Sequence, residues 1–103
     1  MLTATEVKNY LKIDYADDDT LISAGIQAGY DYLSNAIDDF SDLLDSNETF
    51  ARQVKIWVLT QWMPAFYDQR EGMYMDSPVL NYAARSQLTQ LQMYEYVEEE
   101  EDD

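Results

Sequence analysis

The sequence predicts an all-α fold, a compact bundle of about four helices with a disordered acidic C-terminal tail. Apolar residues recur at helical spacings of three and four along most of the chain. Helix-capping residues precede several of these stretches, and no segment longer than a few residues alternates with the period of a strand. Hydrophobic residues make up 47% of the 103 residues, which is ample for a folded core. We therefore expect one helical domain over residues 1–94 and a tail over residues 95–103.

The first predicted helix covers residues 4–13 and begins with a capping box. Thr3 and Glu6 have the spacing at which each side chain accepts a hydrogen bond from the backbone N–H of the other. Leu2 and Val7 lie where a hydrophobic staple closes over such a cap. These features fix the start of the helix from sequence alone.

The second predicted helix covers residues 19–37 and contains two glycines. Asp17 or Asp18 can cap it, and the neighbouring carboxylates favour the positive end of its dipole. One face carries apolar or small residues at spacings of four, three, four and four: Ile22, Ile26, Gly29, Leu33 and Ile37. Gly25 and Gly29 each cost about 1 kcal/mol relative to alanine in a helix. Close backbone approach usually offsets such a cost, so we expect a tight helix crossing, within the subunit rather than between subunits.

The third predicted helix follows a loop with a short helical turn over residues 38–47, and Ser46 or Asn47 can cap it. Its stripe has a strict spacing of four: Phe50, Val54, Val58, Trp62 and Phe66. Such a stripe drifts around an α-helix by about 40° per step, and further apolar residues widen it. We expect this helix in the middle of the domain or against a second subunit. Pro64 should kink it or mark its last turns.

The fourth predicted helix follows a stop at Gly72 and begins at Ser77-Pro78, with serine as the cap and proline in the first position. Its predicted buried face consists of Leu80, Ala84, Leu88 and Leu91. Beyond it, seven of the nine residues 95–103 are acidic. A block of like charge repels itself and buries nothing, so we expect a disordered tail. The tail can serve as a solvated extension, as a surface that repels or guides DNA, or as a DNA mimic.

Composition excludes several classes of function. The 6 basic and 21 acidic residues give a net charge of −15, which rules out ordinary binding of nucleic-acid phosphates and opposes docking on anionic lipid. With no cysteine and no histidine, the chain lacks a thiolate, a disulfide framework and the commonest general base and metal ligand. No apolar run approaches the ~20 residues of a membrane span, and no secretory signal pattern opens the chain. We expect an intracellular protein without membrane contact.

The carboxylates do not form a catalytic or metal-binding pattern. Asp14, Asp17, Asp18 and Asp19 lack the ligand spacing, glycine and bidentate glutamate of an EF-hand loop, and helix capping explains them better. Catalysis by paired carboxylates needs a cleft that pushes their pKa values apart, whereas these acids lie in runs typical of a solvated surface. We therefore expect no enzyme, no catalytic residue, no cofactor and no metal ligand.

A series of short motifs runs along most of residues 1–94. A Glu-Val-Lys-x-Tyr-Leu-x-Ile-Asp helix over residues 6–14 leads through an Asp-rich turn into a Leu-Ile-containing helix with Tyr30 or Tyr32 near its end. An apolar run over residues 54–63 precedes an aromatic–Tyr–x–x–Arg ending over residues 66–70. A last helix begins near a Ser/Pro boundary and finishes with leucine. This order of motifs resembles the small head–tail connector (adaptor) proteins of tailed phages and prophages.

The resemblance implies a structural protein of the virion that forms a ring of about a dozen copies beneath the portal protein. Such a ring extends the DNA channel, lets DNA pass without specific binding, and docks the tail or a stopper protein. Before assembly the subunit would reside in the host cytoplasm. The negative charge suits this role, because a carboxylate lining repels phosphates at every position along the channel.

We expect the subunit or partner interface in the aromatic segment that follows the middle of the third helix. The predicted interface residues are Trp57, Trp62, Phe66, Tyr67, Arg70, Met73 and Tyr74. They are more than one helix face can bury, so some should stay exposed, and an exposed patch of this kind usually marks a partner site. The few basic residues Arg52, Lys55, Arg70 and Arg85 should each have an acidic partner, within a subunit or between subunits.

Two other functions agree with the composition. The first is an acidic DNA mimic that occupies the phosphate-binding groove of a DNA-binding enzyme. The second is an acidic helical adaptor that binds another protein. Charge favours the DNA mimic as much as the connector, whereas the order of the N-terminal motifs and the aromatic third helix favour the connector.

Overall fold

The longest helical body of the protein is an unbroken run of residues 48–68, here called the central helix. In the computed structural model, which describes residues 1–13, 19–68 and 80–95, this run comprises α4 (Glu48–Trp57), the π-helical segment η1 (Val58–Trp62) and α5 (Met63–Asp68). The other helices are α1 (Ala4–Leu11), α2 (Asp19–Ala36), α3 (Phe40–Ser46) and α7 (Tyr82–Leu91). The described residues contain no strand, which confirms the predicted all-α fold.

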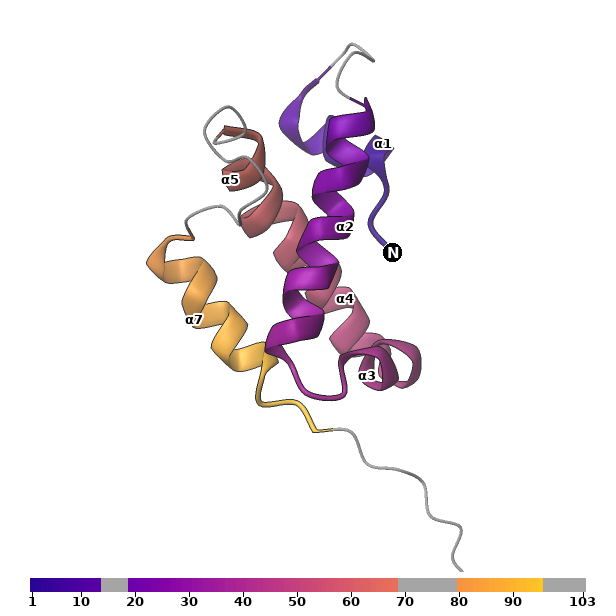
Figure 1. Ribbon diagram of the computed structural model, residues 1–103, viewed down its shortest axis with the longest axis vertical. Coiled ribbons are helices and arrows are strands. Elements are labelled where there is room, and N and C mark those ends of the chain that lie inside the picture. Colours follow the sequence, from indigo (N-terminus) through magenta and orange to yellow (C-terminus); the bar gives the residue numbers. More distant parts are fainter. Residues whose placement is uncertain (14–18, 69–79, 96–103) are drawn as a thin grey trace, which may run out of the picture.

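The other helices are arranged around the central helix (Figure 1). α2 packs across η1 and α5, and α1 packs on α2. α3 packs against α4, and α7 packs against α4 from another side. The central helix therefore contacts a partner helix along most of its length, which explains why it is apolar over so much of its circumference.

One continuous core joins these helices. The predicted face of α2 is buried, Gly25 is buried beside it, and so are all four residues of the predicted α7 face. The side chains at spacings of four on the central helix are buried as well: Phe50, Val54, Val58, Trp62 and Phe66. Within the described part of the chain, no polar or charged side chain is buried in this core.

The two glycines of α2 lie where the central helix comes closest. A Cβ atom added at Gly25 would lie 2.6 Å from Cε2 of Phe66, and one added at Gly29 would lie 2.8 Å from Cδ1 of Trp62. The indole Nε1–H of Trp62 also donates a 3.0 Å hydrogen bond to the carbonyl oxygen of Gly25. The predicted tight crossing is therefore confirmed, and it lies within the subunit.

The π-helical segment lies in the turn before Pro64 and has a local cause. Proline lacks the N–H that would bond to the carbonyl of Thr60, and its ring collides with that carbonyl in a regular α-helix. In the wider turn, the N–H of Met63 donates to the carbonyl of Val58, five residues earlier. The helix ends at Asp68, so Pro64 lies in its last turns as predicted, and the turn before Pro64 takes this π-helical form. Because a π turn holds more residues than an α turn, it offsets part of the drift of the four-residue stripe.

Helix ends follow local capping chemistry. Asn47, not Ser46, caps α4, and its Oδ1 accepts a 3.0 Å hydrogen bond from the N–H of Phe50. α7 begins later than predicted, because Asn81 is its cap and accepts a 2.9 Å hydrogen bond from the N–H of Ala84. Several predicted features lie outside the described residues: Asp14, Asp17, Asp18, Gly72, Ser77-Pro78 and the tail beyond Glu95.

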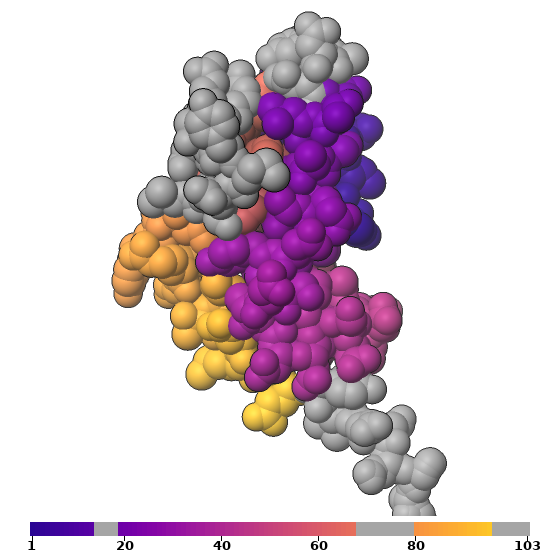
Figure 2. All heavy atoms as spheres, viewed as in Figure 1, coloured from indigo at the N-terminus to yellow at the C-terminus, as the bar shows by residue number. Residues whose placement is uncertain are grey.

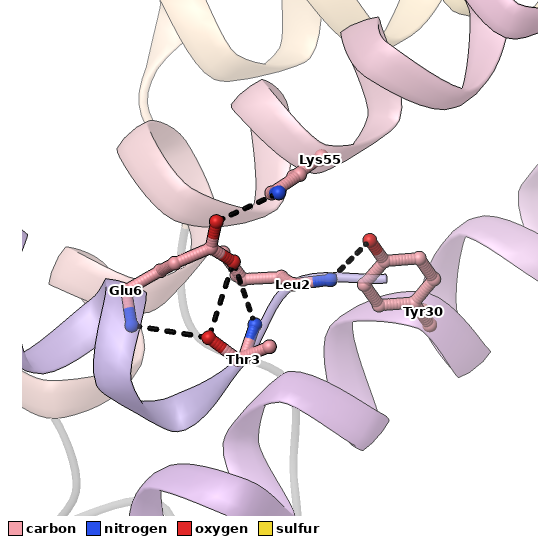
Figure 3. A network of polar contacts seen from close by, with 5 residues as sticks. All are labelled: Leu2, Thr3, Glu6, Tyr30 and Lys55. Carbon is pink, nitrogen blue, oxygen red and sulfur yellow. Dashed lines mark hydrogen bonds and ion pairs between the residues drawn. The ribbon is translucent and has the colours of Figure 1, made fainter.

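A polar network attaches α1 to the rest of the domain (Figure 3). Thr3 and Glu6 form the predicted capping box, with hydrogen bonds of 3.0 and 3.2 Å. The second carboxylate oxygen of Glu6 pairs with Nζ of Lys55 on α4 at 2.7 Å. The N–H of Leu2 donates a 3.2 Å hydrogen bond to the hydroxyl of Tyr30 on α2. The first turn of α1 is therefore tied to both α2 and α4.

The network changes the acidity of two groups. The hydrogen bond from Lys55, helped by the backbone of Thr3, lowers the pKa of the Glu6 carboxyl. Burial raises the pKa of the Tyr30 hydroxyl. At neutral pH the network therefore contains an ionised Glu6 carboxylate and a neutral Tyr30 phenol.

Replacing Gly29 by alanine should destabilise the protein. Alanine gains about 1 kcal/mol of helix propensity, but its methyl group would overlap the buried indole of Trp62. Overpacking of this kind costs about 1–3 kcal/mol, so we expect a net loss in the free energy of unfolding measured by urea denaturation. Ser23→Ala, on the exposed side of α2, is the matched control and should change it by less than about 0.5 kcal/mol. A stabilised Gly29→Ala variant would contradict the tight crossing.

Replacing Glu6 by glutamine should remove a pH-dependent part of the stability. Glutamine still accepts the hydrogen bond from Thr3, but it loses the ion pair with Lys55. Because the folded-state pKa of Glu6 is lowered, its contribution is present above the unfolded-state pKa and is lost as pH falls through the folded-state pKa. At pH 7 the melting temperature of wild type should exceed that of Glu6→Gln, and this gap should close as the pH falls into the acid range. Glu95→Gln, an exposed control, should show no such gap.

Candidate interaction surface

Three of the predicted interface residues lie in the core. Trp57 is 2% exposed, Trp62 is 1% exposed and Phe66 is 9% exposed. Tyr67 is partly buried and packs against the core. Arg70, Met73 and Tyr74 lie outside the described residues. The side chains of Trp57, Trp62 and Phe66 are therefore buried within one subunit, and the predicted interface of this segment stays a prediction for its other members.

The two buried tryptophans each bond to a different helix that packs on the central helix. Nε1–H of Trp57 donates a 2.9 Å hydrogen bond to the carbonyl of Ala84 on α7, while Trp62 bonds to α2 as described above. The ring of Tyr32 lies against both indoles, stacked on Trp57 with centroids 6.3 Å apart and tilted against Trp62 at 5.0 Å. One helix face could not bury so many rings, but a central helix with partners on several sides can.

The distribution of charge singles out a different surface. None of the 21 acidic residues falls in residues 49–67 or 80–94, whereas Arg52, Lys55 and Arg85 do. These two stretches form most of the central helix and all of α7, and α4 and α7 pack together. The fold therefore brings two acid-free segments of an acidic chain to one side of the molecule.

A groove of about 330 Å³ runs between α4 and α7 on this side. Its lining combines glutamine amides with apolar and aromatic groups: Gln53, Ile56, Trp57, Gln87, Gln90, Leu91 and Tyr94. A shallower hollow of about 460 Å³ on α7 is lined by Tyr82, Arg85, Ser86, Thr89 and Gln90. The two depressions share Gln90 as a lining residue. We call the surface formed by their lining residues the acid-free face.

The acid-free face exposes large apolar groups. Tyr82 is 78% exposed and Ile56 is 46% exposed. Aromatic side chains such as tyrosine are enriched where proteins meet. Together with the glutamine-lined groove, they mark the face as a candidate site for a protein partner.

Arg85 supplies the positive charge of this face. Its guanidinium donates a 3.0 Å hydrogen bond to the carbonyl of Leu80, and no described carboxylate forms an ion pair with it. Lys55 does have the expected acidic partner, Glu6, whereas Arg52 has none among the residues described. The expected acidic partner is therefore confirmed for Lys55, whereas for Arg52 and Arg85 it stays a prediction.

The acidic counterpart is α3 with its flanks. Five exposed carboxylates lie there: Asp38, Asp39, Asp42, Asp45 and Glu48. We call this group the acidic edge. α3 contacts α2 and α4, and it lies on the opposite flank of α2 from α7 in the space-filling view (Figure 2). One subunit therefore carries exposed carboxylates on and around α3 and an acid-free α7 on the other flank of α2.

The described residues offer neither a metal site nor a membrane span. No group of three or more acidic side chains there could hold a metal ion. None of the helices that the structure describes has the length and hydropathy needed to cross a bilayer.

Comparisons with known proteins add no further assignment. A scan against protein-family models, a search of curated proteins and a search of solved structures each found no match. The resemblance described above therefore rests on the sequence motifs alone, and the candidate surface rests on the geometry and charge of this chain.

Trp57→Phe should weaken the attachment of α7. Phenylalanine keeps a ring in the core, but it loses the N–H that bonds to Ala84 and leaves unfilled volume. We expect the free energy of unfolding to fall by about 1–3 kcal/mol in urea denaturation. Tyr82→Phe, at an exposed position on α7, should change it by less than about 0.5 kcal/mol. Equal stability of Trp57→Phe and wild type would show that the indole hydrogen bond contributes little.

Proposed function

We propose that this protein is a head–tail connector subunit of a tailed phage or prophage. In this role about a dozen copies form a ring beneath the portal protein, extend the DNA channel and dock the tail or a stopper protein. The subunit would reside in the host cytoplasm before assembly and at the head–tail junction of the virion afterwards. The observation that carries the proposal is the acid-free face on an otherwise acidic helical subunit.

A DNA channel and a subunit contact place opposite demands on one small protein. A channel lined by carboxylates repels phosphates everywhere and lets DNA slide. Each subunit has a net charge of −15, so neighbouring subunits in a ring repel each other. The contacts between them therefore need a surface free of acidic side chains. The acid-free face offers such a surface, with exposed apolar groups that can contribute to association.

The motif that underlies the resemblance has a structural role here. Glu6 caps α1 and pairs with Lys55, and Lys8 pairs with Asp19 on α2 at 2.7 Å. These side chains set the position of α1 on the domain. Proteins that share the Glu-Val-Lys motif are therefore expected to share this arrangement, which supports the proposal at the level of the fold.

Purified protein should assemble reversibly into rings. Salt should promote assembly, because the Debye length falls to about 3 Å at 1 M and screens repulsion between subunits. Sedimentation velocity across a salt and concentration series should show larger species as both rise, and negative-stain electron microscopy of these samples should show closed rings with a central channel. Added portal rings should bind them.

A different result would favour the alternative functions. A protein that stays monomeric at every salt and concentration, and does not bind portal rings, would overturn the connector proposal. Inhibition of a basic DNA-binding enzyme by that monomer would instead indicate a DNA mimic.

A further inference from the structure

We infer that the acid-free face of one copy docks the acidic edge of a second copy, so that subunits associate head to tail. The inference rests on the proposed self-assembly and adds which two surfaces meet. The partner that docks on the acid-free face is a second copy of this chain, and the docking part of that copy is α3 with its flanking residues.

Charge selects this pairing from the three that the two surfaces allow. Two acidic edges would bring five carboxylates of each copy together, which is repulsive. Two acid-free faces would bring Arg85 near its own equivalent with no acid between them. Only the unlike pairing places the guanidinium of Arg85 beside carboxylates, and complementary potentials of this kind set orientation and suppress wrong contacts.

Hydrogen-bonding capacity leads to the same pairing. Ionised carboxylates only accept hydrogen bonds, and the acidic edge presents them in excess. The acid-free face presents donors: the amide groups of Gln53, Gln87 and Gln90, and the guanidinium of Arg85. The exposed side chains of Ile56 and Tyr82 line the same hollows as these donors and supply the apolar area that a stable contact needs.

The positions of the two surfaces permit a chain of such contacts. α7 and α3 lie on opposite flanks of α2 (Figures 1 and 2), so one subunit can engage a neighbour on each side at once. A contact between two different patches is heterologous, and it gives a closed ring when its rotation closes and a filament when it does not. The same surfaces therefore account for repeated assembly from a single contact.

Reciprocal charge reversal tests the inference. The face variant is Arg85→Glu with Gln90→Glu, and the edge variant is Asp42→Lys with Asp45→Lys; all four positions are exposed. By sedimentation equilibrium, each variant alone should self-associate at least about tenfold more weakly than wild type. An equimolar mixture should recover association, because each contact in an alternating assembly then joins opposite charges.

Controls separate this effect from changes in net charge and folding. Asp31→Lys with Glu95→Lys makes the same charge change as the edge variant at exposed positions outside both surfaces, and it should associate at least as well as wild type. Circular-dichroism melts should show all variants folded. If the face variant unfolds, the single Arg85→Glu variant replaces it in the mixture.

The outcomes distinguish this inference from the proposed function. If the wild type forms rings but the mixture of the two variants associates no better than either variant alone, the head-to-tail pairing is overturned. The connector proposal then still stands. Loss of association in the face variant alone, with the edge variant unaffected, would indicate contact between two acid-free faces. A wild-type protein that never associates would overturn both.

Discussion

The contact of Trp62 with the bare backbone of Gly25 and Gly29 sets how closely α2 approaches the central helix. The indole fills the space that a side chain at position 29 would occupy, while Phe66 fills the space at position 25. The indole N–H also satisfies a buried polar group by bonding to the carbonyl of Gly25. Because α1 packs on α2 and its capping residue Glu6 pairs with Lys55 on α4, the position of α1 also depends on this approach. A single close crossing therefore fixes the relative positions of three helices.

Much of this fold was predictable because its causes are local. The capping box of Thr3 and Glu6, the buried face of α2 and the glycine crossing all follow from residues a few positions apart. The burial of the aromatic side chains was not predictable in this way, because it depends on how many helices surround the central helix. The start of α7 was also mistaken, since Ser-Pro and Asn81 are both good start signals and tertiary packing chooses between them. The turn before Pro64 was anticipated as an irregularity, but its π form was not.

The candidate surface was only partly predictable. The two stretches without acidic residues are visible in the sequence, and a search for gaps in the charge pattern would have found them. They are separated along the chain, however, and only the packing of α7 on α4 brings them together. The interface was predicted in the aromatic segment instead, because large apolar side chains suggest an interface until it is known that the core buries them.

The π-helical segment sets the rotation about the helix axis between α4 and α5, the two halves of the central helix. Trp57, just before the segment, donates to Ala84 on α7, while Trp62 at its end and Phe66 beyond it pack against the glycines of α2. The angle between these two directions depends on how many residues the intervening turn contains. Removing one residue from that turn would rotate everything after it by about 100° and take Phe66 away from Gly25. Five residues thus act as the angular spacer that lets one helix serve two neighbours.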